Sequence, residues 1–182
     1  CELEIMTIFV QKFGGTSVRN VESIKNVAQK IKFELDRGNE VAVVLSAMAG
    51  ETDRLVKLVN DNLATSNFCE YDTIVSTGEQ VSIGLLSMVL QEMGVDAKSW
   101  LGWQIPILTD GVHGMARIRG IDCSKLEECI KSGGVPIVAG FQGLGPENRI
   151  STLGRGAFPS RQSPRRRQRS CRGSPLHSAI LS

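Results

Sequence analysis

The sequence predicts an α/β fold in which a mostly parallel β-sheet lies between helices. Three observations support this prediction. Strand-like and helix-like patterns alternate from residue 6 to residue 141. Residues 40–46 and 135–141 are almost wholly apolar and rich in β-branched side chains, as strands covered on both faces are. Glycines also stand where these elements should end, for example at Gly38 and at Gly133.

The first expected unit is a strand, a loop, a helix and a second strand. In residues 6–12, Ile8 and Val10 alternate with polar neighbours, and two glycines follow, which predicts a strand that ends in a tight turn. Apolar residues then recur at helical spacing over residues 21–35, and Gly38 occupies the position of a helix C-cap. The apolar run at residues 40–46 predicts the next strand.

The same alternation continues through the rest of the first 141 residues. We expect a helix over residues 52–63, a polar break at 65–70 and a longer helix over 72–93. Short strands are expected at 96–101 and 104–107. A helix over 122–132 should stop at two glycines, and 135–141 should form another buried strand.

The composition is that of one soluble globular domain, with 182 residues, of which 41% are hydrophobic and 22% charged. The net charge of +2 is unevenly distributed, because residues 157–182 contain six of the 21 basic residues and no acid, which leaves 15 basic and 19 acidic residues in the rest. Nucleic-acid binding would rest on this tail alone. It is not expected, because Phe158 is the tail's only aromatic residue and no basic face adjoins it.

No membrane attachment and no metal site are expected. No apolar stretch looks long enough to cross a bilayer, and the N-terminal residues lack a basic leader and a cleavage site, so we expect a cytoplasmic protein. The five cysteines are an odd, scattered set, which favours free thiols. His113 and His177 are too distant in sequence to suggest a metal site or a catalytic triad.

The stretch QKFGGTSVRN, residues 11–20, is the first candidate for ligand binding. Gly14 and Gly15 allow the backbone to approach an anion closely, and the start of the following helix offers free N–H groups and a positive dipole end. Lys12 adds a mobile positive charge, so the stretch could bind a polyphosphate. A purely structural turn explains paired glycines equally well, and the Walker sequence is absent.

Two further polar stretches follow or leave buried segments, which is where ligands of open α/β sheets bind. LSAMAGETDRL, residues 45–55, places Ser46 and Thr52 between a strand and a helix. STGEQVS, residues 76–82, places the acid Glu79 within a helix-like stretch. Taken alone, Glu79 is more simply explained as a solvated charge on a helix.

Five motifs together resemble the bacterial-type aspartate kinases of the amino-acid kinase family. They are, in order, KFGGTSV, LSAMAGETDRL, STGEQVS, WQIPILTDGVHGMARI and the run from GFQG to STLGRG, and the resemblance covers residues 6–156. It implies a three-layer αβα sandwich. It also implies transfer of the γ-phosphoryl group of Mg-ATP to the side-chain carboxylate of L-aspartate, which gives 4-phospho-L-aspartate for the synthesis of lysine, threonine and methionine. Family members are usually oligomeric.

The resemblance also implies which residues bind the two substrates. Those around the phosphates would be Lys12, Gly14, Gly15 and Ser46. Aspartate would contact Thr52 and would pair its ammonium group with Glu79.

The remaining implied contacts lie further along the chain. The backbone of Phe141 would line the amino-acid site, and Arg155 would bind the α-carboxylate, with Gly156 also in the substrate site. Lys12 and Arg155 would be the catalytic candidates. Catalysis would then be positioning plus charge stabilisation, because the carboxylate of aspartate is itself the nucleophile.

The resemblance stops after Gly156. The family continues with Gly-Ser-Asp, whereas this sequence has Ala157, Phe158 and Pro159. Residues 157–182 are rich in arginine, serine and proline, which is typical of out-of-frame reading and predicts a disordered tail. We therefore assign residues 1–156 to the N-terminal part of a kinase domain, expect the fold to be incomplete and expect little activity. The alternatives are a non-catalytic phosphate- or aspartate-binding or regulatory fragment, and a genuine basic tail.

Overall fold

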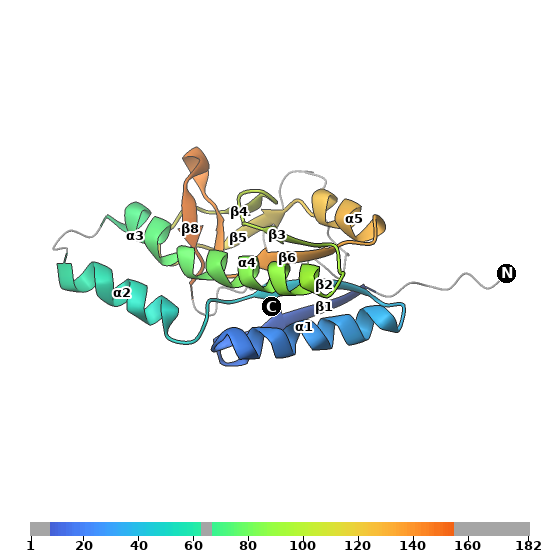
Figure 1. Ribbon diagram of the computed structural model, residues 1–182. Coiled ribbons are helices and arrows are strands. Elements are labelled where there is room, and N and C mark those ends of the chain that lie inside the picture. The colour runs from blue at the N-terminus through green and yellow to red at the C-terminus, as the bar shows by residue number, and fades with distance from the viewer. Residues whose placement is uncertain (1–7, 63–66, 155–182) are drawn as a thin grey trace.

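The computed structural model describes residues 8–62 and 67–154. It contains two four-stranded sheets, with helices packed against the first (Figure 1). The predicted tail at residues 157–182 lies outside the described residues, so the proposed domain division stays a prediction.

The first sheet is parallel throughout and has the strand order β1-β2-β6-β3. Its strands are β1 (Ile8–Phe13), β2 (Glu40–Leu45), β6 (Val135–Ala139) and β3 (Ala97–Trp100). Every residue of β6 and all of β2 except Glu40 are buried, because other elements cover both faces of these two central strands. This confirms the two apolar strands that the sequence predicts.

Helices α1 (Val21–Asp36) and α4 (Thr77–Glu92) cover one face of this sheet. Ile24 and Ile31 of α1 and Leu86 of α4 are fully buried in the core that they form with the sheet. Helix α1 begins where the side chain of Asn20 accepts a hydrogen bond from the Ser23 backbone N–H at 2.9 Å.

The opposite face carries α5 (Ser124–Lys131) and a second sheet, which completes a three-layer αβα arrangement. This second sheet has the order β5-β4-β7-β8 and mixes parallel and antiparallel pairs. Its strands are β5 (Ile118–Ile121), β4 (Ile107–Thr109), β7 (Gln142–Leu144) and β8 (Ile150–Thr152). Their short length and irregular patterning gave no clear strand signal in the sequence.

The strand predicted at residues 104–107 is wrong. Residues 102–106 form turns, and β4 begins only at Ile107. The side chain of Gln104 accepts a hydrogen bond from the Leu101 backbone N–H at 2.8 Å, which closes the first turn. Pro106 then lacks the backbone N–H that a strand pairing would use.

The single helix predicted over residues 72–93 is two helices. Helix α3 (Phe68–Val75) begins earlier, where the Asn67 side chain accepts hydrogen bonds from the backbone N–H groups of Cys69 and Glu70. It ends at Ser76, from which α4 begins. Figure 1 shows α3 beside β8, at the end of the molecule where α2 (Glu51–Asn62) lies.

The stretch from Phe68 to Glu92 also corrects the expectation about membrane spans. Over its 25 residues it is long and apolar enough to cross a membrane, by length and composition. Half of its most apolar 18-residue part is buried inside the protein, as in the core helix of a soluble domain. Length and composition are therefore weak evidence for a span here.

Candidate active site

The carboxyl ends of three parallel strands lie side by side at one edge of the first sheet. Phe13 of β1 pairs with Leu45 of β2, which in turn pairs with Ala139 of β6. Beyond the strands, Ser46 donates its N–H to the Phe13 carbonyl at 3.0 Å, and Gly140 donates to the Leu45 carbonyl at 2.9 Å. The loops that leave β1, β2 and β6 therefore start together, at the edge where open α/β sheets bind ligands.

The two glycines after β1 differ in what the structure requires of them. A Cβ on Gly15 would stand 3.2 Å from the Ala47 carbonyl oxygen, so Gly15 allows this loop to pack closely on the loop after β2. Gly14 has extended backbone, with φ −80° and ψ 172°, and open space where a Cβ would stand. Packing therefore explains Gly15 but not Gly14.

Lys12 and Ser46 lie at the same edge. Lys12 is the penultimate residue of β1, pairs with Val44 and is exposed. It has no ion-pair partner among the described residues, so its charge is available to a ligand. Ser46 is partly buried and directly follows β2.

Glu79 is a buried carboxylate in the first turn of α4. Its side chain is 2% exposed, so the simpler expectation of a solvated helix charge is wrong. One carboxylate oxygen, Oε1, accepts the Ala47 backbone N–H at 3.2 Å, and the buried Oε2 has no hydrogen-bond partner among the described residues. Burial raises the pKa of Glu79 to about 7, against the opposing effect of backbone hydrogen bonds.

A glycine lets α4 approach the loop after β2. A Cβ on Gly78 would stand 2.9 Å from the Cβ of Ala47, closer than two side chains can come. Thr52 is partly buried in the first turn of α2, immediately after this loop. Glu79 and Thr52 are therefore brought to the loop that starts at Ser46.

Phe141 follows β6 in an unusual conformation. Its φ of 61° lies in the left-handed region, which residues with a side chain rarely adopt. Its carbonyl accepts the Leu153 backbone N–H at 2.9 Å, which ties this turn to the residue that follows β8. The β6 strand expected over 135–141 therefore ends at Ala139, two residues before Phe141.

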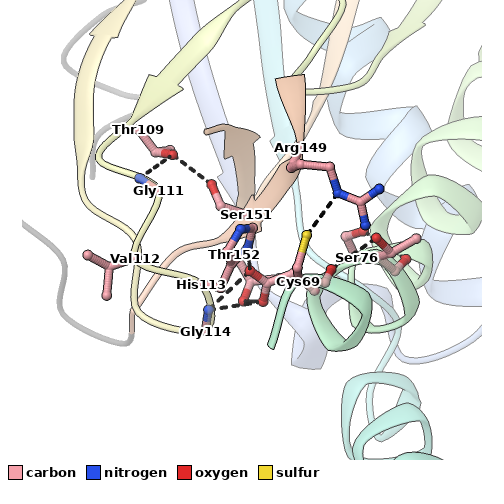
Figure 2. A network of polar contacts seen from close by, with 12 residues as sticks. Cys69, Ser76, Thr109, Gly111, Val112, His113, Gly114, Arg149, Ser151 and Thr152 are labelled. Atoms are coloured by element: carbon pink, nitrogen blue, oxygen red, sulfur yellow. Dashed lines mark hydrogen bonds and ion pairs between the residues drawn. The ribbon is translucent and has the colours of Figure 1, made fainter. Parts of the chain in front are cut away.

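A second polar cluster, centred on Asp72 of α3, was not predicted from the sequence. The fully buried Asp72 carboxylate accepts the Gly114 backbone N–H at 3.1 Å and the Thr152 hydroxyl at 2.5 Å, and its Oδ2 lies 2.7 Å from Nδ1 of His113. Figure 2 shows these contacts converging between α3, β8 and the loop before Gly114. Because Asp72 is separated from these partners by 41 to 80 residues, no local sequence pattern indicates the cluster.

The predicted site residues separate into two groups. The strand edge and the elements packed on it bring together those that the structure describes: Lys12, Gly14, Gly15, Ser46, Thr52, Glu79 and Phe141. Arg155 and Gly156 lie outside the described residues, so their place in the site stays a prediction.

Comparison with known proteins identifies the class to which this fold and strand edge belong. Residues 7–157 match the amino acid kinase family. The chain therefore belongs to the amino acid kinase family.

Within that family, the chain is similar to aspartokinases. It is 46% identical over 154 residues to the aspartokinase of Rickettsia bellii, a match that covers 83% of this chain and 38% of that protein. The crystal structure of aspartate kinase from Synechocystis superposes on this chain with a TM-score of 0.68 at 45% identity. The match covers 83% of this chain and 24% of the other. Aspartokinase III of E. coli, in complex with aspartate and ADP, superposes with a TM-score of 0.69 at 25% identity over 83% of this chain and 44% of the other.

Proposed function

We propose that this chain carries the phosphate- and aspartate-binding side of an aspartate kinase. The reaction would transfer the γ-phosphoryl group of Mg-ATP to the side-chain carboxylate of L-aspartate, giving 4-phospho-L-aspartate and ADP. The observation that carries the proposal is the strand edge, where a glycine loop occurs with a lysine and a buried carboxylate oxygen that both lack a partner within residues 8–62 and 67–154. The aspartate and ADP in the E. coli neighbour support it.

Gly14 and Lys12 suit the phosphates of the nucleotide. No described neighbour requires a glycine at position 14, but an anion that approaches the backbone closely would. The unpaired charge of Lys12 would offset the negative charge that develops on the transferring phosphoryl group. Mg²⁺ would enter with ATP, because Mg²⁺ in such sites is held largely by the substrate phosphates and by water.

Glu79 suits the ammonium group of aspartate. A buried carboxylate oxygen without a hydrogen bond is unfavourable in the free protein, and a cationic partner would remove this penalty. Binding would then favour the ionised form of Glu79. The guanidinium of Arg155 would bind the α-carboxylate, as the resemblance implies.

With both charged groups of its α-carbon bound, aspartate leaves its side-chain carboxylate free to react. A model aspartate side chain has a pKa of about 3.9, so the nucleophile is already ionised at neutral pH and needs no general base. A carboxylate oxygen forms a bond to the γ-phosphorus, while the bond from that phosphorus to the β–γ bridging oxygen breaks and ADP leaves. The chain contributes alignment and charge stabilisation.

Two further parts of the proposal rest on the resemblance. We place the protein in the cytoplasm and in the synthesis of lysine, threonine and methionine. We also expect little or no turnover, because Phe158 and Pro159 stand where the family has a serine hydroxyl and an aspartate carboxylate. The same replacement favours a second candidate function, an aspartate- and phosphate-binding module without catalysis.

Two measurements test the proposal and separate the two candidates. Titration calorimetry should show saturable binding of L-aspartate, weakened by Glu79→Gln, whereas succinate, which lacks the ammonium group, should bind equally weakly to both proteins. Trapping the acyl phosphate with hydroxylamine in the presence of Mg-ATP measures turnover. Binding with turnover supports the kinase, and binding without turnover supports the module. Failure to bind L-aspartate would contradict both.

A further inference from the structure

We propose that Gln142 is a positioning residue for the aspartate site. Its buried side-chain amide ties the turn at Phe141 to the helix junction from which Glu79 projects. The inference rests on the proposed function, because it assigns Gln142 a role in the site where aspartate would bind.

Gln142 is the first residue of β7 and is 2% exposed. Its Nε2 donates to the Ser76 carbonyl at 3.1 Å, and its Oε1 accepts the Gly102 backbone N–H at 3.3 Å. Both ends of the amide are therefore satisfied by backbone groups that are distant in sequence. A buried amide that is hydrogen-bonded through both its nitrogen and its oxygen holds its neighbours in place relative to one another.

The two elements that this amide joins are the two sides of the site. Gln142 directly follows Phe141, whose left-handed backbone leaves β6. Ser76 is the junction between α3 and α4, and Glu79 lies in the first turn of α4. A shift at the junction would therefore move the Glu79 carboxylate relative to the Phe141 backbone.

Helix α3 is also connected to the turn at Phe141 through β8. The Asp72 carboxylate, one turn before Ser76, accepts the Thr152 hydroxyl and so holds β8 against α3 (Figure 2). The next residue after Thr152, Leu153, donates its N–H to the Phe141 carbonyl. The turn at Phe141 is thus connected to α3 on both sides, through β8 and through Gln142.

The test compares two variants of Gln142 with a matched control. Gln142→Met keeps the length of the side chain but removes both hydrogen bonds, and Gln142→Glu keeps an acceptor for Gly102 but removes the donor to Ser76. The control is Gln91→Met, because the Gln91 amide donates to the Ala97 carbonyl at 2.9 Å between α4 and β3. The measurements are the dissociation constant of L-aspartate, the urea midpoint and the NMR amide signals of Ala47 and Leu153.

Both Gln142 variants should raise the dissociation constant of L-aspartate roughly tenfold, because a buried carbonyl loses its donor and the site is displaced. The Ala47 signal, which reports Glu79, and the Leu153 signal, which reports Phe141, should both move. Gln91→Met should lower the urea midpoint without changing the affinity or either signal.

Two results would overturn the inference: wild-type affinity in the Gln142 variants, or unchanged Ala47 and Leu153 signals. If the unmodified protein does not bind L-aspartate, the proposed function fails, and the two amide signals alone decide whether Gln142 positions Glu79 and Phe141. If Gln142→Met does not fold, Gln142→Glu decides by the same measurements.

Discussion

Replacing Glu79 with glutamine should stabilise the free protein above neutral pH while it removes the partner of the aspartate ammonium group. The carboxyl is buried, and its pKa of about 7 compares with a model value of 4.5 in the unfolded chain. Between these two values the folded protein binds a proton that the unfolded chain has lost. Stability of the unmodified protein therefore falls as pH rises through this interval and levels off above it.

The size of this effect follows from the two pKa values. A pKa of about 7 in the folded state and 4.5 in the unfolded state predicts a loss of about 2–3 kcal/mol between pH 5 and pH 8. Glutamine has nearly the same shape and cannot ionise, and its oxygen can still accept the Ala47 N–H. Glu79→Gln should therefore lose none of this stability as pH rises.

Urea unfolding of both proteins at pH 5 and pH 8 measures the difference, since other titrating groups cancel between them. At pH 8 the urea midpoint of the variant should be about 1 M higher than that of the unmodified protein. This shift assumes that the free energy of unfolding falls by roughly 2.5 kcal/mol per molar urea. At pH 5 the two midpoints should lie much closer together. A variant that is less stable than the unmodified protein at pH 8 would refute the argument from burial.

Three further predictions concern the same strand edge. The dissociation constant of L-aspartate should fall about tenfold from pH 6 to pH 8 as Glu79 ionises, while that of succinate stays flat; a flat profile for L-aspartate would contradict the pairing. In a full-length version with the family's Gly-Ser-Asp restored after Gly156, Lys12→Ala should lower the hydroxamate rate on the order of 10²-fold and leave the affinity for aspartate within about twofold; an unchanged rate would remove the role given to Lys12. Gly78→Ala should lower the free energy of unfolding by about 1–3 kcal/mol, because its Cβ would stand 2.9 Å from that of Ala47, and Gly84→Ala, with open space at its Cβ, is the control.

The residue patterns within individual strands and helices were enough to predict the first sheet and the helix α1 that covers it. The apolar runs at β2 and β6 and the helical spacing of α1 were sufficient, because in these elements burial follows directly from side-chain type. The junction at Ser76 was missed because Ser76 itself has helical dihedral angles, φ −69° and ψ −10°. What marks the junction is a hydrogen bond to its carbonyl from Gln142, 66 residues later in the chain.

The sequence predicted which residues make up the candidate site, but it did not predict which of them are buried. The motifs placed Lys12, Gly14 and Ser46 at the ends of predicted strands, and parallel pairing then brings such ends to one edge. They placed Glu79 inside a predicted helix. A helical glutamate, however, looks the same in sequence whether solvent or protein surrounds it. The burial of Glu79 depends on Gly78 and on the loop at Ala47, which only the folded structure brings together.

The strand order of the first sheet also affects how the chain reaches this fold during synthesis. Strand β2 pairs with β1 soon after it is made, but its other edge pairs with β6, through residues such as Val43 and Ile137. At a translation rate of about 5–20 residues per second, that edge waits roughly 5–20 seconds for its partner. Over this interval the apolar segment EVAVVL is an open strand edge without proline, which can pair with a neighbouring nascent chain. We therefore expect aggregation to compete with folding on the ribosome, before β6 has emerged.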